Sequence, residues 1–175
     1  MLRTERVTEQ SKDITKIKRL YHLAFPANER RPLITLLQDD SGTSDFMAFY
    51  DDDIFCGFAC LLTYCDITHI LYFAIDETLR GKGYGTMALK AMGRMKPNHR
   101  FIADIEVETP TADNNEQRRK RKQFYIRNGY IESEVVYRWR QENYEILVCG
   151  GSLTEKEFDD FWRYFEVERK NFSEF

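Results

Sequence analysis

The stretch Arg80-Gly81-Lys82-Gly83-Tyr84-Gly85-Thr86 lies between a predicted strand and the start of a predicted helix. Its three glycines carry no Cβ atom and tolerate positive φ, so several backbone N–H groups of the segment can point at one ligand. The helix that follows adds the partial positive charge of its N-terminus, and Arg80 and Lys82 add formal charge. The segment therefore predicts a binding site for a phosphate or pyrophosphate group.

This segment can be compared with three phosphate-binding motifs. The alternative is a tight turn that binds no ligand. A Walker loop requires Gly-Lys-Ser/Thr, which does not occur in residues 80–86. The dinucleotide fingerprint G-x-G-x-x-G needs a glycine where Thr86 stands, although Glu106 matches the acidic residue that follows that motif about 20 residues on. The pattern [Q/R]-x-x-G-x-[G/A] is satisfied in full by Arg80, Gly83 and Gly85.

Two flanking segments give the loop its context. Residues 71–76, LYFAID, are mostly apolar and predict a buried strand directly before the loop. Residues 123–130, QFYIRNGY, predict a helix end, because Gly129 is a frequent C-terminal stop. With the loop between them, these segments resemble, in order, the GNAT superfamily of acyl-CoA N-acyltransferases, and the resemblance extends over roughly residues 1–149.

Hydrophobic periodicity predicts the remaining elements. Strands are expected over residues 2–8, 45–50, 54–64, 69–75, 100–108, 133–140 and 145–149, and helices over 13–25, 33–38, 114–128, 154–167 and between the loop and Pro97. The helix before Pro97 is expected to carry Ala88, Leu89, Met92 and Met95 on one face. Thr154 and Glu157 resemble a capping box at the start of the last helix. Strands in runs with interspersed helices predict an α/β (α+β) fold. The resemblance implies the GNAT-like acyl-CoA N-acyltransferase fold: a central mixed, mostly antiparallel sheet, splayed at the CoA-binding strand and flanked by helices. With no repeat or linker, we expect one N-acetyltransferase domain over 1–175, with 152–175 a C-terminal helical extension.

The resemblance implies an N-acetyltransferase that uses acetyl-CoA as co-substrate. A primary amine of an unidentified small molecule or peptide would attack the thioester directly. The cofactor-binding residues implied by the resemblance are Phe73, Ala74, Ile75, Arg80, Gly81, Lys82, Gly83, Tyr84, Gly85, Thr86 and Asn114. A backbone N–H near Ile75 is the expected donor to the acyl oxygen as charge builds up on it.

Three residues are candidates for proton transfer. Tyr125 matches the tyrosine that protonates the CoA thiolate in similar enzymes, and a phenol remains protonated at neutral pH; packing of its helix is the alternative role. An amine of pKa about 10.4 must also lose a proton, which calls for a base. His69, at a strand position where some family members carry glutamate, and Glu106 are the candidates. Either can instead be a hydrogen-bonded structural residue.

The predicted helix over 114–128 departs from the family pattern. In N-x-x-A-x-x-F-Y the first two residues would fall at 118 and 121, where Arg118 and Arg121 stand. The basic run 118–122 can be a nucleic-acid patch, a solvated helix face, or a contact to the phosphates of CoA. Residues 25–32 lie where the family builds the wall of the acceptor site, so Glu29 and Arg30 are candidates for substrate selection.

Composition excludes several classes of protein. The 26 basic and 29 acidic residues give a formal charge of −3, which disfavours nucleic-acid and membrane-surface roles. No apolar stretch approaches the roughly 18 residues of a membrane span, and the charged residues near Met1 do not form a signal peptide. We therefore expect a cytoplasmic protein that binds neither nucleic acid nor membrane.

No metal is expected. A metal site is one interpretation of the three adjacent aspartates Asp51, Asp52 and Asp53, but hairpin turns also favour aspartate. The cysteines at 56, 60, 65 and 149 lack paired C-x2-C spacing. Cys56, Cys60 and Cys65 lie in a predicted strand and are interpreted as small reduced core residues, with a disulfide or redox role as the alternative. Two other functions stay open, a non-catalytic acyl-CoA sensor and a nucleotide-cofactor oxidoreductase. The C-terminal extension over 152–175 can cover the sheet, or it can contact a second subunit and so form a homodimer.

Overall fold

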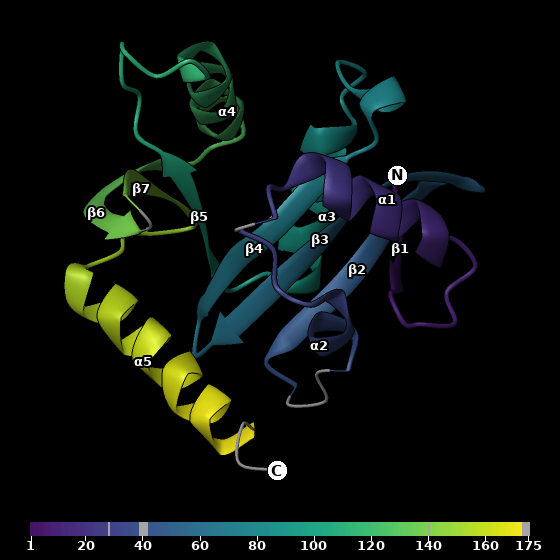
Figure 1. The fold of residues 1–175 in the computed structure, drawn as a ribbon, viewed down its shortest axis with the longest axis horizontal. Coiled ribbons are helices and arrows are strands. Elements are labelled where there is room, and N and C mark those ends of the chain that lie inside the picture. The colour runs from purple at the N-terminus through teal and green to yellow at the C-terminus, as the bar shows by residue number, and fades with distance from the viewer. Residues whose placement is uncertain (28, 39–41, 140, 173–175) are drawn as a thin grey trace. The chain divides into compact units, whose positions relative to one another are not determined.

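The structure is a computed structural model that describes residues 1–27, 29–38, 42–139 and 141–172 (Figure 1). The chain divides into two compact units, Met1–Thr63 with His69–Pro97, and Tyr64–Thr68 with Asn98–Phe175. Strands and helices occur in both units, and the strand pairs are mostly antiparallel. The predicted α/β class, with a mostly antiparallel sheet flanked by helices, is confirmed. The prediction of one domain over 1–175 stays a prediction.

The observed elements match the predicted ones to within a few residues. In chain order they are β1 (Arg3–Arg6), α1 (Ile14–Ala24), α2 (Leu33–Leu37), β2 (Ser44–Asp51), β3 (Ile54–Tyr64), β4 (Ile67–Ile75), the 3₁₀ helix η1 (Glu77–Leu79), α3 (Tyr84–Met95), β5 (Arg100–Glu106), α4 (Asn115–Arg127), β6 (Ile131–Trp139), β7 (Glu142–Cys149) and α5 (Glu155–Phe172). The short helix η1 was not predicted, and it occupies the segment expected to be a loop after β4.

In the first unit the strands follow the order β1-β2-β3-β4. Strands β2 and β3 form a hairpin whose turn is Asp52 and Asp53, with Asp52 at φ 51°. The Asp51 carboxylate accepts a hydrogen bond from the Tyr84 hydroxyl at 2.8 Å, and Asp53 pairs with Lys12 at 3.5 Å. Asp52 and Asp53 thus form the predicted turn, and Asp51 is the last residue of β2. Among the residues that the structure describes, no cluster of His, Cys, Asp and Glu is arranged to hold a metal ion.

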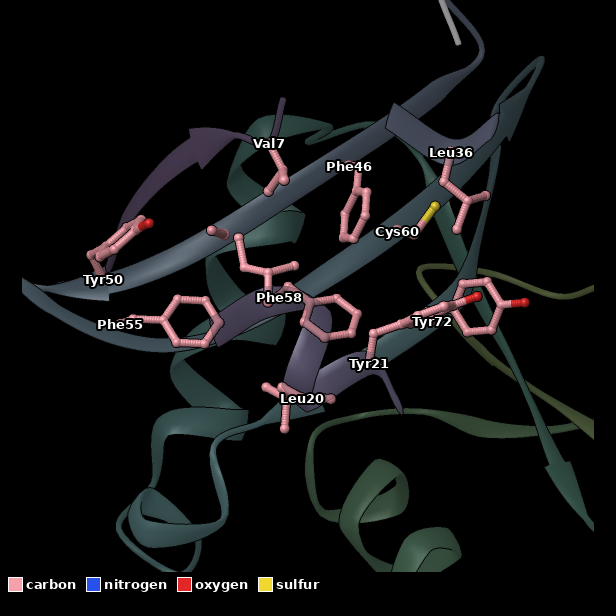
Figure 2. Close-up of a cluster of buried hydrophobic side chains, with 13 residues drawn as sticks. Val7, Leu20, Tyr21, Leu36, Phe46, Tyr50, Phe55, Phe58, Cys60 and Tyr72 are labelled. Carbon is pink, nitrogen blue, oxygen red and sulfur yellow. The ribbon is translucent and has the colours of Figure 1, made fainter. Parts of the chain in front are cut away.

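Helices α1 and α2 lie on one face of these strands and α3 on the other (Figure 1). Beneath α1 and α2 the core is rich in aromatic side chains, with the rings of Tyr21 and Tyr72 in edge-to-face contact at 5.0 Å (Figure 2). On the opposite face, α3 buries Ala88, Leu89 and Met92 as predicted. Met95 was expected on the same face, but it is not buried with the others. It is 45% exposed, because it is the last residue of the helix.

In the second unit the strands follow the order β5-β7-β6, with antiparallel pairs. Helix α5 buries Phe158, Phe161 and Phe165, and Phe158 contacts the Tyr137 ring at 5.4 Å. The predicted capping box is confirmed at its start. Thr154 N donates to Glu157 Oε2 at 2.9 Å, and Glu157 N donates to Thr154 Oγ1 at 3.2 Å.

The cysteines confirm one part of their prediction and contradict another. All four are free thiols, and Cys56 and Cys60 are buried in β3 as expected. Cys65 is exposed, because β3 ends at Tyr64 and Cys65 lies in the turn to β4 with φ 51°. Cys149 at the end of β7 is half-buried. No helix within the described part of the chain has the length and apolar character of a bilayer span.

Candidate active site

The segment after β4 is shaped by one aspartate. Asp76 Oδ1 accepts hydrogen bonds from Thr78 N at 3.0 Å and from Thr78 Oγ1 at 2.6 Å, which starts η1. These bonds keep the pKa of Asp76 below its ordinary value. Arg80 then turns back, and its Nε donates to Ile75 O at 3.4 Å. Residues 80–86, called the Gly loop below, thus begin beside the end of β4.

Two glycines of the Gly loop have the backbone conformation that the sequence predicted. Gly81 has φ 75° and Gly83 has φ 85°, and Gly83 is the N-cap of α3. A Cβ atom at either position would meet nothing within 4 Å, so the requirement for glycine is conformational rather than steric. The first helical bond runs from Met87 N to Gly83 O at 3.0 Å. The N–H groups of residues 84–86 precede it and have no partner within the helix.

The side chains of the Gly loop point to different surroundings. Arg80 and Lys82 are exposed, and both can add positive charge to the anion site formed by the helix start. Tyr84 instead points toward the β2–β3 turn and donates to Asp51, and this bond raises the pKa of its phenol. Tyr84 therefore fastens the first turn of α3, and its backbone N–H is the group available to a phosphate. Gly85 and Thr86 lie in that same first turn.

The end of β4 lies against an irregular part of β3. The β2–β3 register shifts between Phe49 and Tyr50, which makes a bulge near Gly57. A Cβ atom on Gly57 would lie 2.2 Å from Ala74 O, so only glycine fits there. Asp76 N donates to Cys56 O at 2.9 Å just beyond. The bulge therefore holds the backbone of residues 73–75, the predicted pantetheine-binding segment.

His69 lies in the same strand, at the sixth position before Ile75. Its side chain is 1% exposed. A residue in that position exchanges protons with bulk water only through other groups. A structural role and a role as base both fit this burial.

In the second unit, Tyr125 lies near the end of α4 and is 7% exposed. Its ring packs against Phe124 at 5.3 Å and Tyr130 at 5.0 Å. Burial raises the pKa of the Tyr125 phenol to about 12, the nearby Asp104 carboxylate adds to the rise, and the Arg121 guanidinium opposes it. The phenol is thus a proton donor throughout the neutral range.

Glu106 and Asn114 are brought together by a buried arginine. Arg118 Nη2 lies 3.2 Å from Glu106 Oε1 and 3.1 Å from Glu142 Oε2, and Arg118 Nε donates to Asn114 Oδ1 at 2.8 Å. Arg118 Nη1 donates to Val107 O at 3.0 Å. Asn114 Nδ2 completes the ring with a bond to Glu106 Oε2 at 3.3 Å. We call these five residues the Arg118 network.

The Arg118 network tests the alternatives given for the basic run 118–122, namely a nucleic-acid patch, a solvated helix face and a contact to CoA. Arg118 is 6% exposed, so for this residue both the solvated face and the nucleic-acid patch are wrong. Arg119 and Lys120 are exposed and pair with Glu116, as on a solvated face. Lys122 pairs with the carboxylates of Glu132 and Glu145. Whether any member of the run contacts CoA stays a prediction.

Sequence reasoning missed Arg118 as a buried residue. Asn114, Arg118 and Tyr125 are spaced by four and seven positions, which places them on one face of α4. That spacing was the available signal, since an arginine on the face of the buried tyrosine must find acidic partners. The other predicted residues fall into two groups. The Gly loop and residues 69 and 73–75 belong to the first unit, and residues 106, 114 and 125 belong to the second.

Comparison with known proteins identifies the class of this chain. The family model for the acetyltransferase (GNAT) domain matches residues 42–132, more than half of the sequence. The matched region contains β4, the Gly loop and Tyr125. The chain therefore belongs to the GNAT acetyltransferase family. A comparison with curated proteins gives no match.

Solved structures agree with this assignment at the level of the fold. A GNAT-family acetyltransferase from Bacteroides thetaiotaomicron has a TM-score of 0.76 at 22% identity, with 94% of this chain and 96% of that chain covered. The ribosomal-protein-S18-alanine N-acetyltransferase from Escherichia coli has a TM-score of 0.63 at 14% identity, with 88% and 96% covered. A GNAT acetyltransferase from Elizabethkingia anophelis with acetyl-CoA bound has a TM-score of 0.57 at 13% identity, with 85% and 97% covered.

Proposed function

We propose that this protein is an N-acetyltransferase that transfers an acetyl group from acetyl-CoA to a primary amine of a small molecule or peptide. The observation that carries the proposal is the Gly loop. Two glycines at positive φ directly precede α3, in the connection that follows β4 and η1, and Arg80 and Lys82 of the same connection are exposed. This is the local geometry that binds a pyrophosphate. The family membership and the acetyl-CoA-bound relative support the same co-substrate.

In the proposed reaction the amine nitrogen attacks the carbonyl carbon of the thioester. A tetrahedral intermediate forms, and its oxyanion accepts a hydrogen bond from a backbone N–H near Ile75. The C–S bond then breaks, and Tyr125 gives its proton to the leaving thiolate. Its raised pKa keeps that proton in place until the thiolate appears. The products are an N-acetyl amide and free CoA.

The amine must lose one proton before or during the attack. Glu106 contacts Arg118 through Oε1 and Asn114 through Oε2, so each of its carboxylate oxygens already has a partner in the Arg118 network. This favours His69 as the base, because histidine is the side chain that most often transfers protons in enzymes. A base buried this deeply would act through a water chain or directly on the bound amine.

The first experiment measures thiol release from acetyl-CoA with a panel of amines, namely polyamines, aminoglycosides, amino acids and peptide N-termini. Turnover with any of them supports the proposal. Tight binding of CoA with no turnover across the panel would identify a non-catalytic acyl-CoA sensor instead. The presence of a buried, protonated Tyr125 favours catalysis.

The second experiment measures thermal stability with CoA and with NAD. A ligand at about 100 times its dissociation constant adds roughly 2.7 kcal/mol, so CoA should raise the melting temperature and NAD should not. Stabilisation by NAD alone would point to an oxidoreductase. In the variant Gly83→Asp the shift with CoA should vanish, because the new carboxylate lies at the phosphates. Gly93→Ala, farther along α3, serves as the control that keeps the shift.

A further inference from the structure

The connection between α1 and α2 is fixed to the core by two buried tyrosines. The Tyr21 hydroxyl donates to Arg31 O at 2.9 Å, and Arg31 N donates to the Tyr72 hydroxyl at 3.0 Å. The Tyr72 hydroxyl in turn donates to Glu29 O at 2.8 Å. Figure 2 shows the Tyr21 and Tyr72 side chains next to each other at the edge of the aromatic core. The backbone on both sides of Arg30 is therefore held in one position.

The two arginines of this connection are half-buried, and neither has an acidic partner among the described residues. Arg30 Nε is buried and has no hydrogen-bond partner among the residues that the structure describes. Within that same part of the chain, neither Arg30 nor Arg31 forms an ion pair with a carboxylate. Six other arginines do pair with a carboxylate, namely Arg3, Arg19, Arg100, Arg118, Arg119 and Arg163.

Burial of a guanidinium without a counter-ion is unfavourable. The effect is visible at Arg31, whose pKa is lowered by desolvation, with Tyr72, Cys60 and Tyr21 acting in the opposite direction. The described residues of the connection carry one acidic side chain, Glu29, against two arginines. The segment thus has a net positive charge, and its two cationic groups would be stabilised by an anion from outside the chain.

The position of the pair relates it to the proposed reaction. Tyr72, which holds the connection at two points, directly precedes Phe73 in β4. Residues 73–75 are the segment that the proposed function assigns to the acyl end of acetyl-CoA. The arginine pair is consequently fixed to the same strand as the proposed reaction centre, and all of these residues belong to one compact unit.

We propose that Arg30 and Arg31 form an anion-binding site for the acceptor, so that the acceptor is a primary amine that also carries a carboxylate or a phosphate. The inference rests on the proposed function. Guanidinium groups bind both anions through paired, charge-assisted hydrogen bonds. Polycationic amines such as polyamines and aminoglycosides would be repelled from this site and are poor acceptors.

The experiment compares acceptors in pairs that differ only in the anionic group. One pair is a dipeptide with a free C-terminal carboxylate and the same dipeptide as its amide, and the other is phosphoethanolamine and ethanolamine. Thiol release from acetyl-CoA is measured for each. A charge-assisted hydrogen bond predicts a preference of roughly 10- to 100-fold in kcat/KM for the anionic member. The pair with the larger ratio distinguishes a carboxylate from a phosphate.

The variants Arg30→Gln and Arg31→Gln should reduce this ratio by about tenfold or more, mainly through a lower kcat/KM for the anionic member. Arg30→Lys and Arg31→Lys keep the charge and should restore part of the ratio. Arg94→Gln, an exposed arginine of α3 in the same unit, is the matched control and should leave the ratio unchanged. Melting temperatures of all variants show whether they fold.

Two results would overturn the inference. One is an equal or higher rate with the neutral members in the wild-type protein, and the other is an unchanged ratio in both glutamine variants. If no acceptor is turned over, calorimetry still measures the binding of inorganic phosphate and acetate to the site at Arg30 and Arg31. Binding that Arg31→Gln does not weaken would also contradict the inference. Failure of the proposed function shows separately, as absence of CoA binding in the thermal-shift assay.

Discussion

At the scale of single residues, Tyr125 combines burial with two opposing charges. The ring is enclosed by aromatic neighbours, the Asp104 carboxylate raises its pKa further, and Arg121, one helical turn earlier, lowers it. The net result is a phenol that keeps its proton to about pH 12. Such a group is a weak acid toward water but can protonate a thiolate that forms next to it.

We predict that Tyr125→Phe lowers kcat by about 10- to 100-fold, within the usual range for loss of an acid catalyst. The affinity for CoA should stay within about twofold, because the ring and its packing are kept. Single-turnover kinetics and calorimetry with CoA measure the two effects. Phe124→Leu, which changes the neighbouring ring but no proton donor, is the control, and an unchanged rate in Tyr125→Phe would remove the acid role.

The same phenol predicts a stability change at high pH. Its pKa is about 12 in the folded protein and about 10 in the unfolded chain. The folded state therefore holds a proton that the unfolded state releases, and the free energy of unfolding falls as the pH rises from about 10 to 12. Urea denaturation across this interval should show a smaller decrease in Tyr125→Phe. An equal decrease in both proteins would contradict the assignment of this pKa.

Arg118 is the other residue whose role follows from its surroundings. Replacement by methionine leaves the carboxylates of Glu106 and Glu142 next to a buried apolar group. Both carboxylates retain some contact with water, so we predict a loss of about 2 kcal/mol in the free energy of unfolding, below the 3–5 kcal/mol of a fully buried pair. Arg119→Met, on the exposed side of α4, should cost less than about 1 kcal/mol. Equal effects of the two changes would contradict a buried network.

At the scale of elements, replacement of the glycine that caps α3 and of a glycine within α3 should have opposite effects on stability. Gly83 at the N-cap has φ 85°, whereas Gly93 lies within the helix, and a Cβ atom at either position meets nothing within 4 Å. Gly83→Ala should cost about 1–2 kcal/mol because alanine is strained at positive φ. Gly93→Ala should gain about 0.5–1 kcal/mol from higher helix propensity. Urea denaturation of both variants tests the signs, and a stabilising Gly83→Ala would contradict the left-handed N-cap.

At the scale of the whole molecule, the open question is whether the two compact units unfold together. Both tryptophans, Trp139 in β6 and Trp162 in α5, belong to the second unit. Tryptophan fluorescence therefore reports that unit, whereas far-ultraviolet circular dichroism reports the helices and strands of both. Comparison of the two signals separates the behaviour of the units.

If residues 1–175 form one domain, as the sequence predicts, the two signals should give the same denaturation midpoint. A destabilising change in the first unit should then shift the tryptophan transition as well. Gly57→Ala is suited to this, because its Cβ atom would lie 2.2 Å from Ala74 O. Two separate denaturation midpoints would show two independent domains. A tryptophan transition with the same midpoint in Gly57→Ala as in the wild type would show the same.

The features that the sequence predicted well are local ones. The Gly loop, the aspartate turn between β2 and β3 and the capping box at Thr154 each depend on a few consecutive residues whose backbone preferences are strong. The order of strands and helices also followed from hydrophobic periodicity. Family motifs in the correct order then predicted the GNAT fold, which the family match to residues 42–132 confirms.

The sequence by itself thus determined the elements, the conformation of the Gly loop and the family of this protein, because each is encoded by neighbouring residues. Only the tertiary structure decided that Arg118 is a buried partner of Glu106 and Glu142. It likewise decided that Arg30 and Arg31 are half-buried with no carboxylate partner within the part of the chain that the structure describes. It also decided that Cys65 is exposed. The physical reason is that burial and ion pairing depend on residues far apart in the chain, which meet only after the strands have paired.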